Sequence, residues 1–141
     1  MKASKSLRAP PRPPLSVIHF PEGLPGFENH THFTLVQEEE LQPIVFLLSL
    51  VDPGIQFPVV PIQKIHQNYQ LQLSEEDRRT LVLAGEPVVG ENLLCLAILT
   101  LGDGTQPATA NLFAPIVVNL ESWMAKQVIL FNSNYSVTAE V

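Results

Sequence analysis

Residues 92–119 read NLLCLAILTLGDGTQPATANLFAPIVVN and carry the clearest structural signal in the chain. The apolar run at residues 92–101 has the length and composition of a buried strand. The Gly-Asp-Gly tripeptide at residues 102–104 predicts a hairpin turn, because glycine and aspartate tolerate positive φ. Residues 109–119 then return as the second strand. Pro115 within them predicts a bulge or an edge position, since proline cannot donate to a ladder.

Short segments on either side of this hairpin extend the pattern. We predict strands at residues 16–20, 32–36, 44–51, 57–61, 69–73, 126–131 and 135–139. The almost wholly apolar segment 44–51 is predicted to be buried on both faces, whereas the prolines in 57–61 predict an edge or irregular strand. Many short strands joined by tight turns indicate a mainly β protein, a small antiparallel β-barrel-like single domain with one or two short helices.

The best helix start in the sequence is Ser74-Glu75-Glu76-Asp77. Ser74 can cap the free amides, and the three acidic residues lie at the positive end of the helix dipole. Asp77 stands where a capping box normally has Glu or Gln, so the sequence predicts an imperfect box. We expect two to three turns that end at Gly85.

Length and composition limit what the chain can be. It has 141 residues, 45% of them hydrophobic, which is enough for one domain with a packed core. The single cysteine, Cys95, rules out an intramolecular disulfide, and its apolar neighbours predict a buried, inert thiol. No apolar run reaches the length of a membrane span, and the basic N-terminus continues into prolines rather than a signal-peptide core. We therefore expect a soluble, cytoplasmic protein.

Charge divides the chain into two parts. Four of the eight Lys and Arg residues lie in residues 1–14, which are also proline-rich and are predicted to form a flexible basic tail. Such a tail could contact nucleic acid, but a solvated leader explains it as well. Residues 15–141 hold four basic and 14 acidic residues, a formal charge of −10. This acidic body would repel phosphate backbones and attract a basic protein, so we expect a protein partner and no direct nucleic-acid binding.

The loop at residues 21–28, PEGLPGFE, contains two glycines and two prolines and must be an ordered turn. Leu24 and Phe27 could anchor a partner there, because a stiff backbone lowers the ordering cost of binding. Phe27 could equally close one end of the barrel, with Gly26 merely permitting the turn. For Asn111 and Asn119, hydrogen bonds that tie strand ends or a bulge are the competing explanation for a partner role.

Conventional catalytic or metal-binding chemistry is hard to assemble from this sequence. Glu28, His30 and His32 alternate and could face one side of a strand as a metal cluster, or form a polar row that faces solvent. There is no nucleophile elbow, no P-loop and no dinucleotide fingerprint. The acidic clusters at 38–40 and 75–77 are consecutive, which is typical of solvated faces, although any of these residues could lie on the surface that a partner contacts. We predict no enzyme activity, no cofactor and no metal.

Three segments together resemble one known family. They are the loop FPEGLPGFE at residues 20–28, the stretch SLVDP at residues 49–53, and TANLFAPIVVN at residues 109–119 followed by QVIL at 127–130. In this order and spacing they resemble the flagellar assembly factor FliW family, over nearly all of residues 16–135. The resemblance implies a small β-barrel-like protein of the bacterial cytoplasm that is not an enzyme.

The resemblance also implies two protein partners. Members of the family bind the RNA-binding translational regulator CsrA, relieve its repression of flagellin synthesis, and bind newly made flagellin in a partner switch. The candidate partner-binding residues are Glu22, Leu24, Pro25, Gly26, Phe27, Glu28, Asp52, Asn111 and Asn119. Two other functions remain open, a flagellin chaperone only and a small barrel that holds an apolar or saccharide ligand. Trp123 is compatible with such a ligand site, although a packing role or a flap over the barrel end explains it as well.

Overall fold

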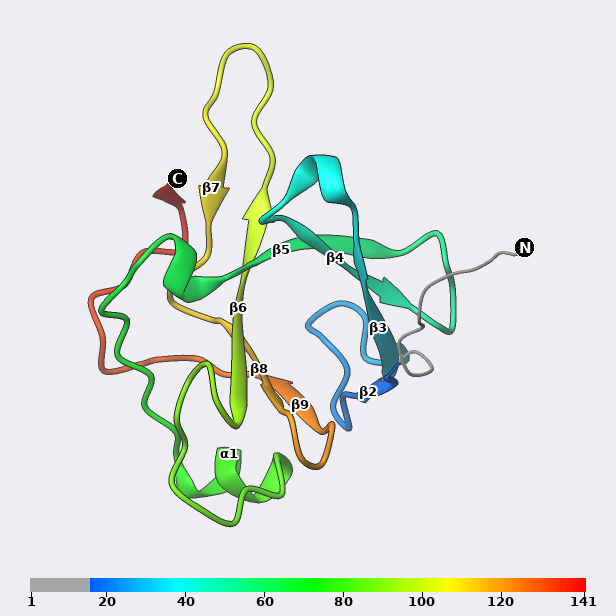
Figure 1. Ribbon diagram of the computed structural model, residues 1–141, viewed down its shortest axis with the longest axis vertical. Helices are drawn as coiled ribbons and strands as arrows, with labels where there is room; N and C mark the ends of the chain where they lie inside the picture. Colours follow the sequence, from blue (N-terminus) through cyan, green and yellow to red (C-terminus); the bar gives the residue numbers. More distant parts are fainter. Residues whose placement is uncertain (1–15) are drawn as a thin grey trace.

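A computed structural model describes residues 16–141, so the tail predicted at residues 1–14 lies outside the described part. The fold there is mainly antiparallel β with very little helix (Figure 1). The elements in chain order are β2 (Ile18–His19), β3 (His32–Gln37), the 3-10 turn η1 (Glu39–Leu41), β4 (Val45–Ser49), β5 (Gln56–Pro61), the 3-10 turn η2 (Ile62–Lys64), α1 (Glu75–Thr80), β6 (Leu93–Thr100), β7 (Thr109–Ala110), β8 (Ile116–Asn119), β9 (Ala125–Gln127) and β10 (Ala139–Glu140).

The predicted hairpin forms around β6, the longest strand among the described residues. One edge of β6 pairs with β5, and the other pairs first with β8 and then with β7, all antiparallel. The returning strand is split, because residues 111–115 stand opposite only Ala97 and Ile98. This interruption is the bulge that Pro115 predicted. It turns the two halves of the returning segment into separate strands.

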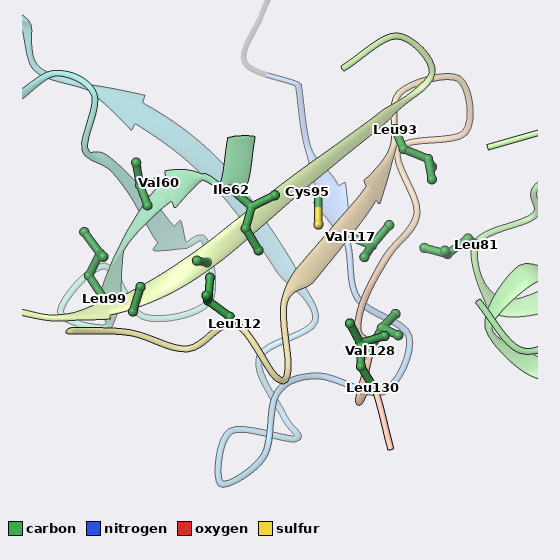
Figure 2. Packing of buried hydrophobic residues seen from close by; sticks show 12 residues of the cluster. Val60, Ile62, Leu81, Leu93, Cys95, Leu99, Leu112, Val117, Val128 and Leu130 are labelled. Carbon is green, nitrogen blue, oxygen red and sulfur yellow. The ribbon is translucent and has the colours of Figure 1, made fainter. Parts of the chain in front are cut away.

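Strand β6 is buried on both faces. Its odd-numbered residues, Cys95 and Ala97 among them, face an outer core that also contains Val128 and Leu130. Figure 2 shows this outer core, with Leu81 pointing toward Val117 from the segment that follows α1. The even-numbered residues of β6 face an inner core, whose largest fully buried side chains include Phe20 and Phe33. Two-sided burial explains why the sequence of β6 is almost continuously apolar.

The inner core is enclosed by a sheet that curves but does not close. Along the path β10-β7-β6-β5-β4-β3-β2, with β8 and β9 branching from β6, the end strands β2 and β9 do not form a ladder. They approach each other through an isolated bridge between His19 and Met124, where His19 N donates to Trp123 O at 2.9 Å. The description as barrel-like is therefore loose, although the antiparallel β class is confirmed.

Two strand environments differ from the prediction. The segment 57–61 was expected at an edge, but β5 lies between β4 and β6. The prolines are accommodated because Pro58 has a register partner only on β4 and Pro61 only on β6. The segment 44–51 was expected to be buried on both faces, but only Leu47 and Ser49 of β4 are buried, whereas Phe46 and Leu48 on the other face are covered only in part.

Three predicted strands have different bounds or are absent. Residues 69–73 form no ladder, although Tyr69, Leu71 and Leu73 alternate inward and pack on the outer core. Strand β9 ends at Gln127, whereas the prediction ran to residue 131, and β10 comprises only Ala139–Glu140. Beyond β9 the backbone still bonds to the bulge, since Val128 N donates to Pro115 O and Leu130 N donates to Phe113 O, both at 2.9 Å, but these bonds do not extend the strand.

Helix α1 begins as predicted and ends earlier. Ser74 Oγ accepts from Asp77 N at 3.0 Å, and Asp77 Oδ2 accepts from Ser74 N at 3.0 Å, so the capping box is complete and not imperfect. The helix ends at Thr80 and not near Gly85, because Leu81 turns into the outer core and Val82 adopts a positive φ of 53°.

Among residues 16–141 the structure contains no helix with the length and apolarity that a bilayer crossing requires.

The turn that joins β6 to β7 forms without the left-handed glycines that the sequence suggested. Gly102 and Gly104 are not among the positive-φ residues. Instead Asp103 Oδ1 accepts from Thr105 N at 2.7 Å and from Gln106 N at 2.9 Å, which closes the turn. Gly102 is required for space, since a Cβ there would lie 2.3 Å from Gln106 O.

Cys95 provides a test of this central strand. It is 2% exposed, and burial raises the pKa of its thiol to about 12. We expect the native protein to leave Ellman's reagent unreacted at pH 8 for as long as it stays folded, and to release one equivalent of chromophore within seconds in guanidinium chloride. Rapid reaction of the native thiol would contradict the placement of β6 between two cores.

Candidate functional site

The candidate site is a groove of about 560 Å³ in which three segments distant in the sequence meet. One wall is the loop at residues 22–28, the second is the start of α1, and the third is β9 with the residues that follow it. The loop and the QVIL segment are two of the motifs singled out from the sequence, and the fold brings them together. The groove residues are Glu22, Gly23, Pro25, Glu28, Ser74, Glu76, Asp77, Lys126, Gln127, Ile129 and Phe131.

The loop is held rigid by its own backbone. Leu24 and Phe27 form an isolated antiparallel bridge, in which Phe27 N donates to Leu24 O at 2.7 Å. Gly23 has φ +65°, and a Cβ on it would lie 2.6 Å from the Cα of Glu28, so only glycine fits. Gly26 has φ +84° with open space around it, and its N–H donates to Glu28 Oε2 at 3.1 Å. The ordered turn predicted for this loop is confirmed.

The candidate residues of the loop divide between core and surface. Leu24 is 3% exposed and belongs to the inner core, so its side chain supports the loop from beneath. Phe27 is half-buried and packs edge-on against Phe57, with ring centroids 5.3 Å apart. Glu22, Pro25, Gly26 and Glu28 are exposed. The surface that this loop offers to a partner is therefore acidic, with the edge of one aromatic ring.

An ion pair forms the floor of the groove. Lys126 Nζ lies 2.8 Å from Asp77 Oδ1, and each side chain is 13% exposed. Burial opposes ionisation of Asp77, but hydrogen bonds from Lys126 and Ser74 outweigh it, so the pKa of this carboxyl lies below its usual value. Burial likewise disfavours the charge on Lys126, yet the contact with Asp77 raises the pKa of the amine. Asp77 thus joins the cap of α1 to β9.

The rest of the groove combines negative charge with exposed apolar surface. Glu22 and Glu76 both add to the negative potential at Lys126, whose own charge is already matched by Asp77. Ile129 is 44% exposed and Phe131 is 78% exposed. Phe131 is the most exposed large hydrophobic side chain among the described residues. Large exposed apolar residues rimmed by charge are typical of protein-binding surfaces.

The SLVDP motif at residues 49–53 has a structural explanation. Ser49 is fully buried, and its Oγ accepts from Val51 N and Asp52 N, both at 3.1 Å. With both lone pairs engaged, the hydroxyl proton is directed to His30 Nδ1, 2.8 Å away. Through these bonds the buried serine closes the end of β4 and holds the turn that follows it. Asp52 accepts from Gly54 N at 3.0 Å and remains exposed.

The row of Glu28, His30 and His32 is not gathered into a metal cluster. His30 contacts Ser49 and Phe27, whereas His32 stacks on His19 with ring centroids 4.8 Å apart. Within residues 16–141 no three His, Cys, Asp or Glu side chains are close enough to hold an ion.

The two candidate asparagines make hydrogen bonds to the backbone. Asn111 Oδ1 accepts from Phe113 N and Ala114 N, both at 3.0 Å, and so shapes the bulge. Asn119 is 1% exposed, and its Nδ2 donates to Leu81 O at 2.8 Å, which ties β8 to the segment after α1. Both contacts agree with the hydrogen-bonding explanation that the sequence left open.

Comparisons with known proteins identify the family. The family model described as FliW protein matches residues 11–141. The chain belongs to the FliW family. It is 40% identical to the flagellar assembly factor FliW of Pseudothermotoga lettingae over 122 residues, which cover 86% of this chain and 75% of the relative. With the protein of the same name from Bacillus subtilis it shares 33% identity over 120 residues, 85% of this chain and 81% of the relative.

Solved structures agree with this assignment. The chain is similar to a crystal structure of the flagellar assembly factor FliW, with a TM-score of 0.79 and 31% sequence identity. The similarity covers 88% of this chain and 84% of the crystallised one. The resemblance noted from the three sequence motifs is therefore confirmed.

Only three of the eleven groove residues in this FliW-family chain, Glu22, Pro25 and Glu28, were among the candidates predicted from the sequence. Glu76 was interpreted as a solvated residue that could also lie on a partner surface, and Lys126, Ile129 and Phe131 were not considered as site residues. A signal for Lys126 was available, since it is one of only four basic residues in the acidic body. No sequence signal placed Ile129 and Phe131 at the surface, because their alternation was equally compatible with a strand that faces the core.

The Asp77–Lys126 pair allows a pH test. At pH 7 we expect Asp77→Asn to lower the free energy of unfolding by about 1–2 kcal/mol, because Lys126 loses its partner in a partly buried site. The folded-state pKa of Asp77 is depressed, so its contribution is complete above its ordinary pKa, about 3.9, and is lost as pH falls through the folded value. Urea unfolding between pH 7 and pH 2.5 measures this difference, which should shrink below about pH 4.

Glu75→Gln is the matched control for this test. Glu75 lies in the same first turn of α1 but is exposed, so its loss should cost only a few tenths of a kcal/mol through the helix dipole. A difference for Asp77→Asn that persists unchanged to pH 2.5 would show that the ion pair does not stabilise the fold.

Proposed function

We propose that this chain is a flagellar assembly factor of the bacterial cytoplasm that binds a CsrA-type RNA-binding regulator and flagellin as alternative partners. In this proposal, binding relieves the repression of flagellin synthesis by the regulator, and new flagellin competes for the free protein. The name shared by the relatives, flagellar assembly factor FliW, supports the general role. The partners are inferred from the family resemblance and from the chemistry of the groove.

The groove is the observation that carries the proposal. It presents Glu22, Glu28 and Glu76 around the exposed side chains of Ile129 and Phe131. A basic RNA-binding protein offers the complementary charge. The two apolar side chains would be removed from water when the partner binds, which favours the complex. The formal charge of −10 on residues 15–141 would attract a positively charged partner over a distance and so raise its rate of association.

The rigidity of the groove supports the same function. Both the loop bridge between Leu24 and Phe27 and the Asp77–Lys126 pair hold their segments before any partner arrives. A surface ordered in advance loses little conformational entropy on binding. The acidic body could then inhibit an RNA-binding regulator by repelling phosphates near it, without covering the RNA site itself.

Isothermal titration calorimetry with purified CsrA from the same organism tests this proposal. We expect binding that weakens between 50 and 300 mM salt, because the contact is partly electrostatic. The double variant Glu22→Gln/Glu76→Gln removes two groove charges and should raise Kd about tenfold at low salt. Flagellin added first should abolish the heat.

The control variant is Glu38→Gln/Glu39→Gln. This variant also removes two negative charges, but from the start of η1 and the residue before it, neither of which lines the groove. We expect at most about a twofold effect from this variant. Equal weakening by both variants would show that net charge and not the groove drives binding. If flagellin binds with measurable heat and CsrA does not, the protein would be a flagellin chaperone, and the regulatory half of the proposal would be wrong.

A further inference from the structure

A second cavity, of about 350 Å³, lies at one end of the inner core. Ile18 and Leu96, each 1% exposed, form its base. Leu35, Val45 and Leu94 line its sides and are only partly buried, although they pack against the same core. These side chains come from five different strands when Pro61 of β5 is included, so the cavity is a feature of the fold and not of one loop.

The cavity exists because the sheet separates at this end. Strand β4 pairs with β5 only as far as Val45 and Val59, after which Val60 and Pro61 continue beside β6 alone. On the other side, β2 has no ladder with β9 and makes only the single bond from His19 N to Trp123 O. The inner core therefore remains open where a closed barrel would have filled it with side chains.

Trp123 borders this opening in an unusual conformation. Its φ is +61°, which is a rare value for a bulky residue. The surrounding backbone holds it there, since Trp123 N donates to Asn119 O at 2.7 Å and Trp123 O accepts from His19 N at 2.9 Å. Strained residues that are fixed in this way cluster at ligand sites. Here the strain places an indole ring, the only one in the chain, on the wall of an apolar cavity.

The chemistry of the lining indicates what the cavity accepts. None of the described residues that line it is charged, so an ionic ligand would lose its hydration without gaining a partner. Its polar residues are Ser16, Thr34 and Gln37, and the Thr34 hydroxyl already donates to Ser16 O at 3.3 Å. The Gln37 side chain is exposed, so it offers a neutral amide at the cavity edge.

We propose that this cavity is a binding site for a neutral, apolar small molecule with an aromatic or alkyl body and at most one uncharged polar group. The body would occupy the space between Leu35, Val45 and Leu94 and contact the indole of Trp123. The polar group would lie at the edge beside Gln37. Cavities at the mouths of barrel-like sheets, lined by apolar side chains with a few polar groups, are typical small-molecule sites.

The neutral fluorophore N-phenyl-1-naphthylamine tests this site with the full-length protein. We expect saturable binding with energy transfer from Trp123, since the indole lies in the cavity wall. Val45→Phe fills the cavity and should weaken binding at least tenfold. Leu35→Phe fills it from β3 and serves if the first variant does not fold, as judged by circular dichroism. Val137→Phe places the same ring at an exposed position outside the cavity and should leave binding unchanged.

Competition defines the ligand class. Decanol should displace the fluorophore at concentrations at least tenfold lower than decanoate, because the described residues that line the cavity offer no cation to a carboxylate. Binding that is not saturable, or that the two filling variants leave unchanged, would overturn the site. Equal displacement by decanol and decanoate would overturn its assignment to neutral ligands. CsrA binding does not depend on the outcome, so the two proposals fail separately.

Discussion

The two-sided burial of β6 is the constraint on which the rest of the structure depends. A strand with a core on each face must have neighbours that reach both cores, and the returning segment achieves this by dividing at the bulge formed by residues 111–115. The half that follows the bulge, β8, leads directly into β9, and β9 forms one wall of the groove. The position of the candidate functional surface is thus a consequence of how β6 is covered.

The groove and the second cavity show two different results of an incompletely closed sheet. At the groove, the Asp77–Lys126 pair joins α1 to β9 and leaves a polar, negatively charged depression. At the other opening, none of the lining side chains in residues 16–141 is charged, and the depression is mostly apolar. A protein surface recognises partners by such differences, with charge for steering and apolar area for affinity. We therefore propose different ligands for the two sites, a basic protein for the groove and a neutral small molecule for the cavity.

Sequence alone predicted those features that depend on local chemistry. The hairpin around residues 102–104, the Ser74 cap, the buried Cys95 and the rigid loop at 21–28 were all indicated by neighbouring residues. Features that depend on distant partners were not predicted. Strand β5 is central because two other strands flank it, and Tyr69 lies in no strand because none is in register with it. The groove combines residues about a hundred positions apart, and single-sequence patterns carry no information about that contact.

The central claim is that the partner binds at the acidic groove. Hydrogen–deuterium exchange of the full-length protein, free and saturated with CsrA, tests it most directly because it reports every backbone segment at once. We predict slowed exchange at residues 22–28, 74–77 and 126–131, the three walls of the groove, and unchanged exchange at η1 and the β6–β7 turn. Protection confined to η1 or to that turn, with the groove unchanged, would contradict the account.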